Sequence, residues 1–278
     1  MNEIDRATFH SEVRAAGEDL SPARAGLLFA REIAYPDLRP SDYLAQLDDV
    51  ALAARVALAP HATAETRGLA LAEFLFQSLG LRGNRADYYD PRNSYLNEVL
   101  GRRLGIPISL SAVYLEIGQQ LGLPVAGVGL PGHFVVAVDA PAGPLYLDPF
   151  NGGVRLTLED CAQRVRSASG YRGVFDPRWL IFTPPREIVA RMLNNLRGFY
   201  VQVEDWPLAI AVLERLRELQ PGVPAHLRDL GLLHYRNGAL RLASSLLDEY
   251  LAREPDAADF DAVRQSRDLL VEHVVRLN

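Results

Sequence analysis

The chain has 278 residues, a formal net charge of −6 and a single cysteine, Cys161. Its 49% hydrophobic and 23% charged residues are those of a globular protein, and the negative charge argues against binding to a phosphate backbone. One cysteine excludes an internal disulfide framework and a cysteine-based metal finger. No apolar run reaches the roughly 18 residues that a membrane-spanning helix needs. All 29 basic residues are arginine, which excludes lysine-based catalysis.

Residues 1–89 are predicted to form a helical N-terminal region. Ser41 is placed to cap a helix with one apolar face, because a serine side chain can accept a hydrogen bond from the first turn. A further helix is expected over residues 64–79, ending at Gly80. The segment GLRGNRADYYDPRN is rich in turn residues and predicts an irregular loop.

Two helices are predicted next, at the start of a core that extends over residues 90–183. Apolar residues recur at helical spacing over residues 93–104, and Gly105 is expected to end that helix. The helix over residues 109–121 is apolar on most sides, which is typical of a buried helix.

The period then changes from that of a helix to that of short strands. Three valine-rich segments, VAGVGL, HFVVAVDA and PLYLDPF, are separated by turns that contain Pro and Gly. Such segments are typical of antiparallel strands. Thr157 is placed to cap one more helix, over residues 157–168. The core is therefore predicted to belong to the α+β class.

Residues 186–278 are predicted to form a separate helical domain with an internal repeat. Five positions recur 34 residues later, as Leu196/Leu230, Tyr200/His234, Ala209/Ala243, Leu213/Leu247 and Pro221/Pro255. This period, with a small residue at the helix crossing and a proline that closes the second helix, is typical of tetratricopeptide repeats. Two repeats need caps, so the last helix, over residues 259–277, is expected to cover one end.

Three segments, YYDPRNSYLNEVLGRRLGIPISLS, GVGLPGHFVVAV and LYLDPFNGG, resemble the bacterial SirB-type protein family. That family has a transglutaminase-like domain followed by short tetratricopeptide repeats, and the resemblance covers nearly the whole chain. It implies a transglutaminase- or papain-like core, in which a central helix packs on an antiparallel sheet. In true transglutaminases the nucleophilic cysteine opens the central helix, and a histidine and an aspartate follow on adjacent strands.

His133 and Asp148 match that histidine and that aspartate. A carboxylate beside an imidazole fixes the tautomer and orientation that a general base requires. The same pair can instead be a buried polar link between two strands. Asp148 also precedes Pro149 at the end of a strand, where an aspartate commonly forms a turn. The sequence is compatible with each of these roles.

No cysteine stands where the resemblance places the nucleophile, because the ungapped match puts Pro107 there. Ser109 and Ser111 follow closely and are candidate nucleophiles with His133 as their base. A serine near a helix start more commonly caps the helix. Cys161, in the segment LTLEDCAQRV, is expected to be a small buried residue of a short helix.

Four more residues flank the central helix and match the family motif: Tyr88, Tyr89, Asn93 and Asn97. The two asparagines could line a polar cleft or hydrogen-bond the carbonyl groups of the loop. We favour the second role.

Two hypotheses for the function follow. In the first, the protein is a pseudoenzyme that binds a protein or peptide partner through its helical repeats and cleft. In the second, it is a hydrolase or acyltransferase of amide or peptide bonds, in which His133 and Asp148 act with Ser109, Ser111 or water. We favour the first because the nucleophilic cysteine is missing.

The same composition sets the remaining expectations. One histidine and one aspartate are too few ligands for a metal site, and we expect no cofactor. The net charge and the lack of a long apolar run predict no nucleic-acid and no membrane partner. The lone cysteine and the acidic, non-signal-like segment MNEIDRATFH favour a cytoplasmic location.

Overall fold

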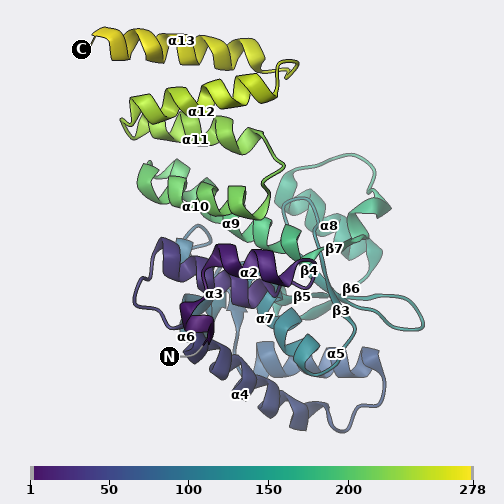
Figure 1. The fold of residues 1–278 in the computed structure, drawn as a ribbon. Helices are drawn as coiled ribbons and strands as arrows, with labels where there is room; N and C mark the ends of the chain where they lie inside the picture. Colours follow the sequence, from purple (N-terminus) through teal and green to yellow (C-terminus); the bar gives the residue numbers. More distant parts are fainter. Residues whose placement is uncertain (1–2, 277–278) are drawn as a thin grey trace. The chain divides into compact units, whose positions relative to one another are not determined.

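The computed structural model describes the backbone of residues 3–276 and the side chains of residues 3–272 (Figure 1). It divides into two compact units, Met1–Met192 and Leu193–Asn278. Within the described residues, no helix combines the length and the apolar character that a membrane crossing needs.

Helices form the first part of the first unit. They are α1 (Glu3–Arg6), α2 (Phe9–Ala16), α3 (Pro22–Ile33), α4 (Pro40–Leu58), α5 (Ala64–Glu73) and the π-helix η1 (Phe74–Ser78). Thr8, Ser21 and Thr63 cap α2, α3 and α5, each accepting a hydrogen bond from a backbone N–H of the first turn. The predicted helix over residues 64–79 is therefore present, but its last turn is wound as a π-helix.

The prediction that Ser41 caps a helix is wrong. Helix α4 begins one residue earlier, at Pro40, and Arg39 occupies the cap position without a side-chain hydrogen bond. The Ser41 hydroxyl donates instead to Asp5, with an Oγ–Oδ2 distance of 2.9 Å. The Ser41 side chain, which the local sequence pattern predicts to be a helix cap, thus binds the carboxylate of Asp5, 36 residues earlier in the chain.

The first predicted helix of the core is shorter than expected. A 3-10 turn, η2 (Pro91–Asn93), precedes α6 (Leu96–Arg102). The helix ends in a left-handed residue, Arg103, with φ 57°, and not at Gly105. Gly105 lies instead against α7, where a Cβ would come within 2.8 Å of the Ser109 hydroxyl oxygen.

Helix α7 (Pro107–Gln120) is the buried helix of the first unit, as the sequence predicts. It begins two residues before the expected start, because Pro107 takes the first helical position, where its missing N–H costs nothing. Of its fourteen residues only Glu116, Gln119 and Gln120 are even partly exposed. The rest of the first unit therefore packs around this helix.

The antiparallel sheet is confirmed, and its strand order is β6-β5-β4-β3-β7. The strands are β3 (Val125–Val128), β4 (Val135–Val138), β5 (Leu145–Asp148), β6 (Val154–Leu156) and β7 (Phe182–Thr183). Val135 and Ala137 pack on one face with helix α8 (Leu158–Ser169). Val138, which points the other way, contacts α5 at Gly68, and α7 lies against β3 and β4. The sheet is therefore covered on both faces. A two-stranded parallel pair, β1 (Arg82–Gly83) and β2 (Leu104–Gly105), lies apart from it.

The second unit consists of antiparallel helices that pack in sequence order. They are the end of α9 (Pro185–Gln202), α10 (Trp206–Leu219), α11 (Ala225–Arg236), α12 (Leu240–Arg253) and α13 (Phe260–Arg276). Ala209 and Ala243 are fully buried, as the repeat pattern predicts for the helix crossings. The expected last residue of the final helix, Leu277, lies outside the described residues.

The crossing of α11 and α12 leaves no room for a larger side chain, so Ala243→Leu is expected to destabilise the second unit. A Cβ on Gly231 would already lie 2.7 Å from Leu247 and 3.2 Å from the Ala243 carbonyl oxygen. Overpacking of this kind costs about 1 to 3 kcal/mol of unfolding free energy. Urea unfolding followed by far-ultraviolet circular dichroism measures it. Ala252→Leu, an exposed position of the same helix, is the control and should change little.

Candidate functional site

His133 and Asp148 lie side by side at one end of the sheet, on neighbouring strands. His133 follows the turn that precedes β4, in which Gly132 takes a φ of 72°, and Asp148 is the last residue of β5. The imidazole Nε2 atom is 3.1 Å from Asp148 Oδ1. This nitrogen is buried and makes no well-aligned hydrogen bond within the described residues. The two residues are therefore a close pair whose alignment differs from that of a tight imidazole–carboxylate hydrogen bond.

The Asp148 carboxylate is fully buried and has two further partners besides His133. Arg164 Nε donates to its Oδ2 atom over 2.8 Å, and Asn151 donates to both oxygens from its backbone N–H and its side-chain amide. Burial alone would raise the pKa of Asp148, but His133, Asn151 and Arg164 together outweigh it and hold that pKa below its usual value. The carboxylate is therefore ionised, and a guanidinium already balances its charge.

The loop that carries His133 is fixed by a second arginine. Arg191 Nη2, on α9, donates to the carbonyl oxygens of Leu130 and His133, at 3.0 and 3.2 Å. Its guanidinium carbon also lies 5.2 Å from the centre of the Phe134 ring. Neither Arg164 nor Arg191 was identified from the sequence, because each comes from a helix far along the chain and belongs to no local motif.

The serines at the start of α7 donate to backbone oxygens. Ser109 Oγ lies 2.6 Å from the Asn93 carbonyl oxygen and accepts the Ile106 N–H over 3.1 Å. Ser111 Oγ donates to the Pro107 carbonyl oxygen over 2.7 Å. Both side chains are fully buried, and in the described part of the chain no hydrogen bond joins either hydroxyl to His133. The structure thus gives both serines a role in holding the helix start.

An aromatic and polar rim lies beside the imidazole. The Phe150 ring meets the His133 ring edge-on with centroids 6.3 Å apart, and Tyr88 meets Phe150 at 5.7 Å. Asn93 donates to the carbonyl oxygens of Asp87 and Tyr88, which confirms its predicted loop role. The Oδ1 atom of Asn97 is buried without a partner in the described structure. The rim is therefore a loop fixed by hydrogen bonds, with Tyr89 largely exposed at its edge.

Comparisons with known proteins agree with this architecture. A family model described as the transglutaminase-like superfamily matches residues 41–194, which is more than half of the chain. The chain belongs to the transglutaminase-like superfamily. A model described as tetratricopeptide repeat matches residues 196–267, which confirms the repeats predicted from the period of 34.

Bacterial relatives match most of the chain. A UPF0162 protein of Xylella fastidiosa is 38% identical over 251 residues, or 89% of each chain. A UPF0162 protein of Vibrio cholerae is 28% identical over 204 residues, or 73% of this chain and 75% of that one. The human F-box only protein 21 is 42% identical over 95 residues, which are 31% of this chain and 15% of that protein.

Within this transglutaminase-like domain, Cys161 is placed as a core residue, as the sequence predicts. It is fully buried on α8, in an apolar cluster with Val135, Ala137 and Val165. Burial, followed by the nearby carboxylates of Asp160 and Asp148, raises the pKa of its thiol to about 11. Since the thiolate is the reactive form, these surroundings disfavour the form of Cys161 that could act as a nucleophile. No cluster of three metal-ligating side chains occurs in the described residues.

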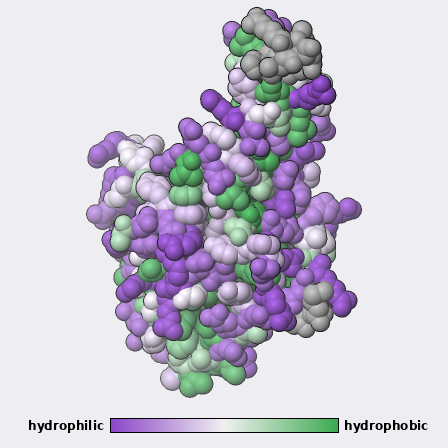
Figure 2. Space-filling view, turned by 90° about the vertical axis from the view of Figure 1, so that its left-hand side faces the viewer, coloured by the Kyte–Doolittle hydropathy of each residue, from purple (hydrophilic) through white to green (hydrophobic). Residues whose placement is uncertain are grey.

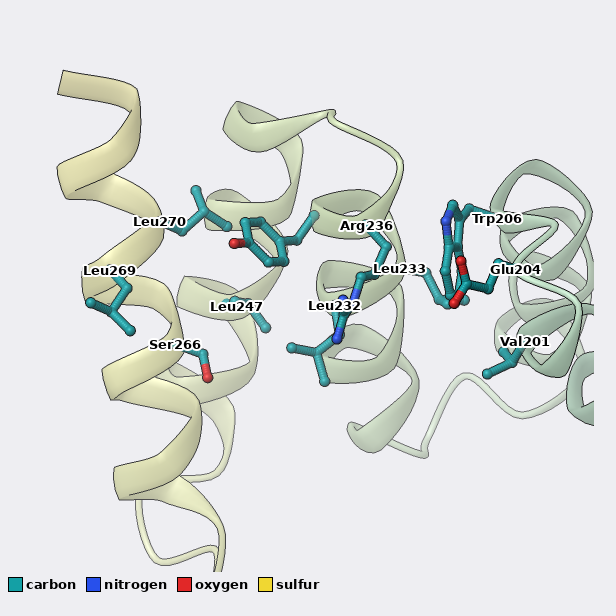
Figure 3. Close-up of a pocket in the computed structure, with 11 residues that line it drawn as sticks. Val201, Glu204, Trp206, Leu232, Leu233, Arg236, Leu247, Ser266, Leu269 and Leu270 are labelled. Carbon is teal, nitrogen blue, oxygen red and sulfur yellow. The ribbon is translucent and has the colours of Figure 1, made fainter. Parts of the chain in front are cut away.

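The tetratricopeptide region holds a second candidate site, a groove of about 530 Å³ on the helical repeats (Figure 3). Leu269 and Ser266 line it from α13, and Leu232 and Arg236 from α11. Val201 lines it from the end of α9, Glu204 from the turn that follows, and Trp206 from the start of α10. Large apolar side chains are exposed there: Leu269 by 61%, Tyr235 by 47% and Leu232 by 39%. In the upper part of Figure 2, a band of hydrophobic side chains runs between hydrophilic ones on the surface.

Asp148→Asn is expected to lower the unfolding free energy of the first unit by about 2 to 4 kcal/mol, because Arg164 then faces a neutral partner at a buried site. The folded-state pKa of Asp148 lies below the unfolded one. Its stabilisation is therefore complete above about pH 4 and is lost as the pH falls through the folded pKa.

Urea unfolding from neutral to acidic pH measures this difference, which should shrink below about pH 4. Asp139→Asn removes the same charge from an exposed position and is the control. An Asp148→Asn variant as stable as the wild type at neutral pH would show that the ion pair contributes nothing.

Proposed function

We propose that this protein is a non-catalytic transglutaminase-like protein that binds a protein or peptide partner through the groove of its tetratricopeptide repeats. The observation that carries the proposal is the exposure of Leu232, Tyr235 and Leu269 in one concave groove. Contiguous apolar surface on a folded unit marks an interaction site more often than a scatter of single side chains does. Helical repeats commonly bind partners on such concave surfaces.

The chemistry of the first unit supports a non-catalytic role. The first residue of α7 is Pro107, which has no side chain that can attack a carbonyl group. Ser109 and Ser111 each donate their proton to a carbonyl oxygen of the backbone. Arg164 Nε lies 2.8 Å from Asp148 Oδ2, so an arginine already pairs with the charge of the carboxylate. Among the described residues, no chain of hydrogen bonds joins Ser109 or Ser111 to His133 and Asp148.

The proposal extends to the family name and the location. The motifs quoted above support membership of the SirB-type family, and a single buried cysteine supports a reducing cytoplasm. Both inferences are independent of the groove.

Peptide binding to the full-length chain tests the groove. Peptides selected from a phage-displayed random library on the immobilised protein should bind the wild type in solution, as measured by fluorescence anisotropy. Leu269→Asp should weaken this binding by at least about tenfold, because a carboxylate in the apolar groove loses its water when the peptide binds.

Two controls locate the effect. Leu52→Asp places the same charge on an exposed leucine of α4 and should leave the affinity unchanged, as should His133→Ala. Loss of binding in His133→Ala but not in Leu269→Asp would contradict the proposal and place the binding site in the first unit.

The hydrolase or acyltransferase stays the second candidate, because His133 Nε2 lies 3.1 Å from Asp148 Oδ1. It requires Ser109, Ser111 or a water molecule to be activated by that imidazole. A serine-reactive fluorophosphonate probe separates the two candidates. We expect no labelling of either serine, with an active serine hydrolase labelled in parallel. Labelling of Ser109 or Ser111 that disappears in His133→Ala would establish the enzyme.

A further inference from the structure

The turn between α9 and α10 contains a residue in a strained conformation. Glu204 has a φ of 57°, in the left-handed region that residues with a Cβ seldom adopt. The equivalent turn of the next repeat, 34 residues later, has Gly238 at this position, with a φ of 80°. Glycine adopts this conformation without steric cost. The first repeat therefore has a glutamate at a position where the second repeat forms the same left-handed turn with a glycine.

The two turns share their backbone hydrogen bonds, although the Asp205 side chain caps α10 and its counterpart Ala239 cannot cap α12 in this way. Asp205 N–H donates to the Tyr200 carbonyl oxygen over 2.9 Å, and its counterpart, Ala239 N–H, donates to the His234 carbonyl oxygen over 2.9 Å. The N–H groups that follow, of Trp206 and Leu240, donate to the carbonyl oxygens of Glu204 and Gly238 over 3.0 Å in both turns. The backbone thus has the same hydrogen bonds at the two positions. The strain at Glu204 comes from the Cβ atom that glycine lacks.

No contact between the Glu204 carboxylate and the described residues compensates for that strain. Glu204 is exposed and lines the groove, and its carboxylate forms no ion pair or hydrogen bond with any described residue. It shares its end of the groove with Trp206 (Figure 3). A carboxylate next to an indole ring is a site for a cation, because the carboxylate carries the charge and the ring face adds cation–π attraction.

The groove itself favours a helical occupant. Its walls are the sides of helices, whose backbone N–H and C=O groups bond within each helix, so they leave no edge with which an extended peptide could pair. A bound helix satisfies its own backbone and presents apolar side chains at positions i, i+3 or i+4, and i+7. Leu232 and Leu269 can accept such a ridge.

We propose that Glu204 is a recognition residue, and that the partner is an amphipathic helix with an apolar ridge and a basic side chain that pairs with Glu204 beside Trp206. This inference rests on the proposed function of the groove and names the chemistry of its ligand. The strain is retained in the first repeat because the carboxylate acts on a partner outside the chain.

Synthetic helical peptides test the charge preference on the full-length protein. Each has about 16 residues, an alanine-rich sequence, a leucine ridge, and arginine, glutamine or glutamate at the polar position that flanks the ridge. By fluorescence anisotropy, the arginine peptide should bind the wild type at least about fivefold more tightly than the glutamate peptide, with a preference that weakens at high salt. Glu204→Gly and Glu204→Gln should abolish the preference, and Glu204→Arg should reverse it. Glu214→Gln makes the same charge change on α10 outside the groove and should keep it.

Thermal unfolding gives an independent readout of the strain. Glu204→Gly should raise the unfolding midpoint of the second unit by about 2 to 4 °C, and Gly238→Glu should lower it. A variant that gains stability and loses the preference for the arginine peptide would show that Glu204 serves binding at the expense of stability.

The outcomes separate this inference from the proposed function. If all three peptides bind equally and Leu269→Asp still prevents their binding, the groove is a docking site and the role of Glu204 is wrong. If no peptide binds, or if Leu269→Asp has no effect, the proposed function fails as well. Sedimentation equilibrium tests whether a second copy of the chain occupies the groove. If the wild type self-associates and Leu269→Asp converts it to a monomer, the second copy is the occupant and the inference is wrong.

Discussion

The buried carboxylate of Asp148 is the constraint on which one end of the first unit depends. An ionised group inside a protein must be matched by hydrogen bonds and opposite charge, and here the partners come from three segments: Asn151 just after β5, Arg164 on α8 and His133 before β4. Satisfying one charge therefore fixes where the strand, the helix and the loop meet. His133 is a member of that set, with its Nε2 atom 3.1 Å from Asp148 Oδ1.

The sequence predicted those parts of the site that local pattern or family resemblance can carry. His133 and Asp148 were found because strand spacing and the resemblance place them on adjacent strands. Arg164 was not found, although it stands three residues after Cys161 in the helix that was predicted from Thr157. A buried carboxylate needs a cation nearby, but all 29 lysine-or-arginine positions of this chain are arginines and they are spread along the sequence. Only the fold determines which arginine lies beside Asp148.

Helix boundaries show the same limit. Ser41 and Gly105 have the right residue types for a cap and for a helix end, yet Ser41 binds Asp5 from α1, and Gly105 is needed where α7 passes closely. Glu204 is the opposite case, since no propensity rule places a glutamate in a left-handed turn. The aligned Gly238 shows what the backbone prefers. Glu204 departs from the backbone preference that Gly238 follows at the equivalent position of the next repeat. The comparison of the two repeats therefore reveals an unusual residue that neither repeat would reveal alone.

The start of α7 shows how a structural role and a catalytic one compete for the same proton. Ser109 accepts the Ile106 N–H, which also reaches the Asn93 carbonyl oxygen, and donates to that same carbonyl oxygen, joining the helix to the preceding loop. To act as a nucleophile, the hydroxyl would have to turn its proton toward an imidazole and leave the buried Asn93 carbonyl oxygen without this donor. The hydrogen bonds that keep this helix start ordered therefore oppose its use as a nucleophile. A cysteine at the position of Pro107 would face no such competition, because its side chain would not be needed to cap the helix.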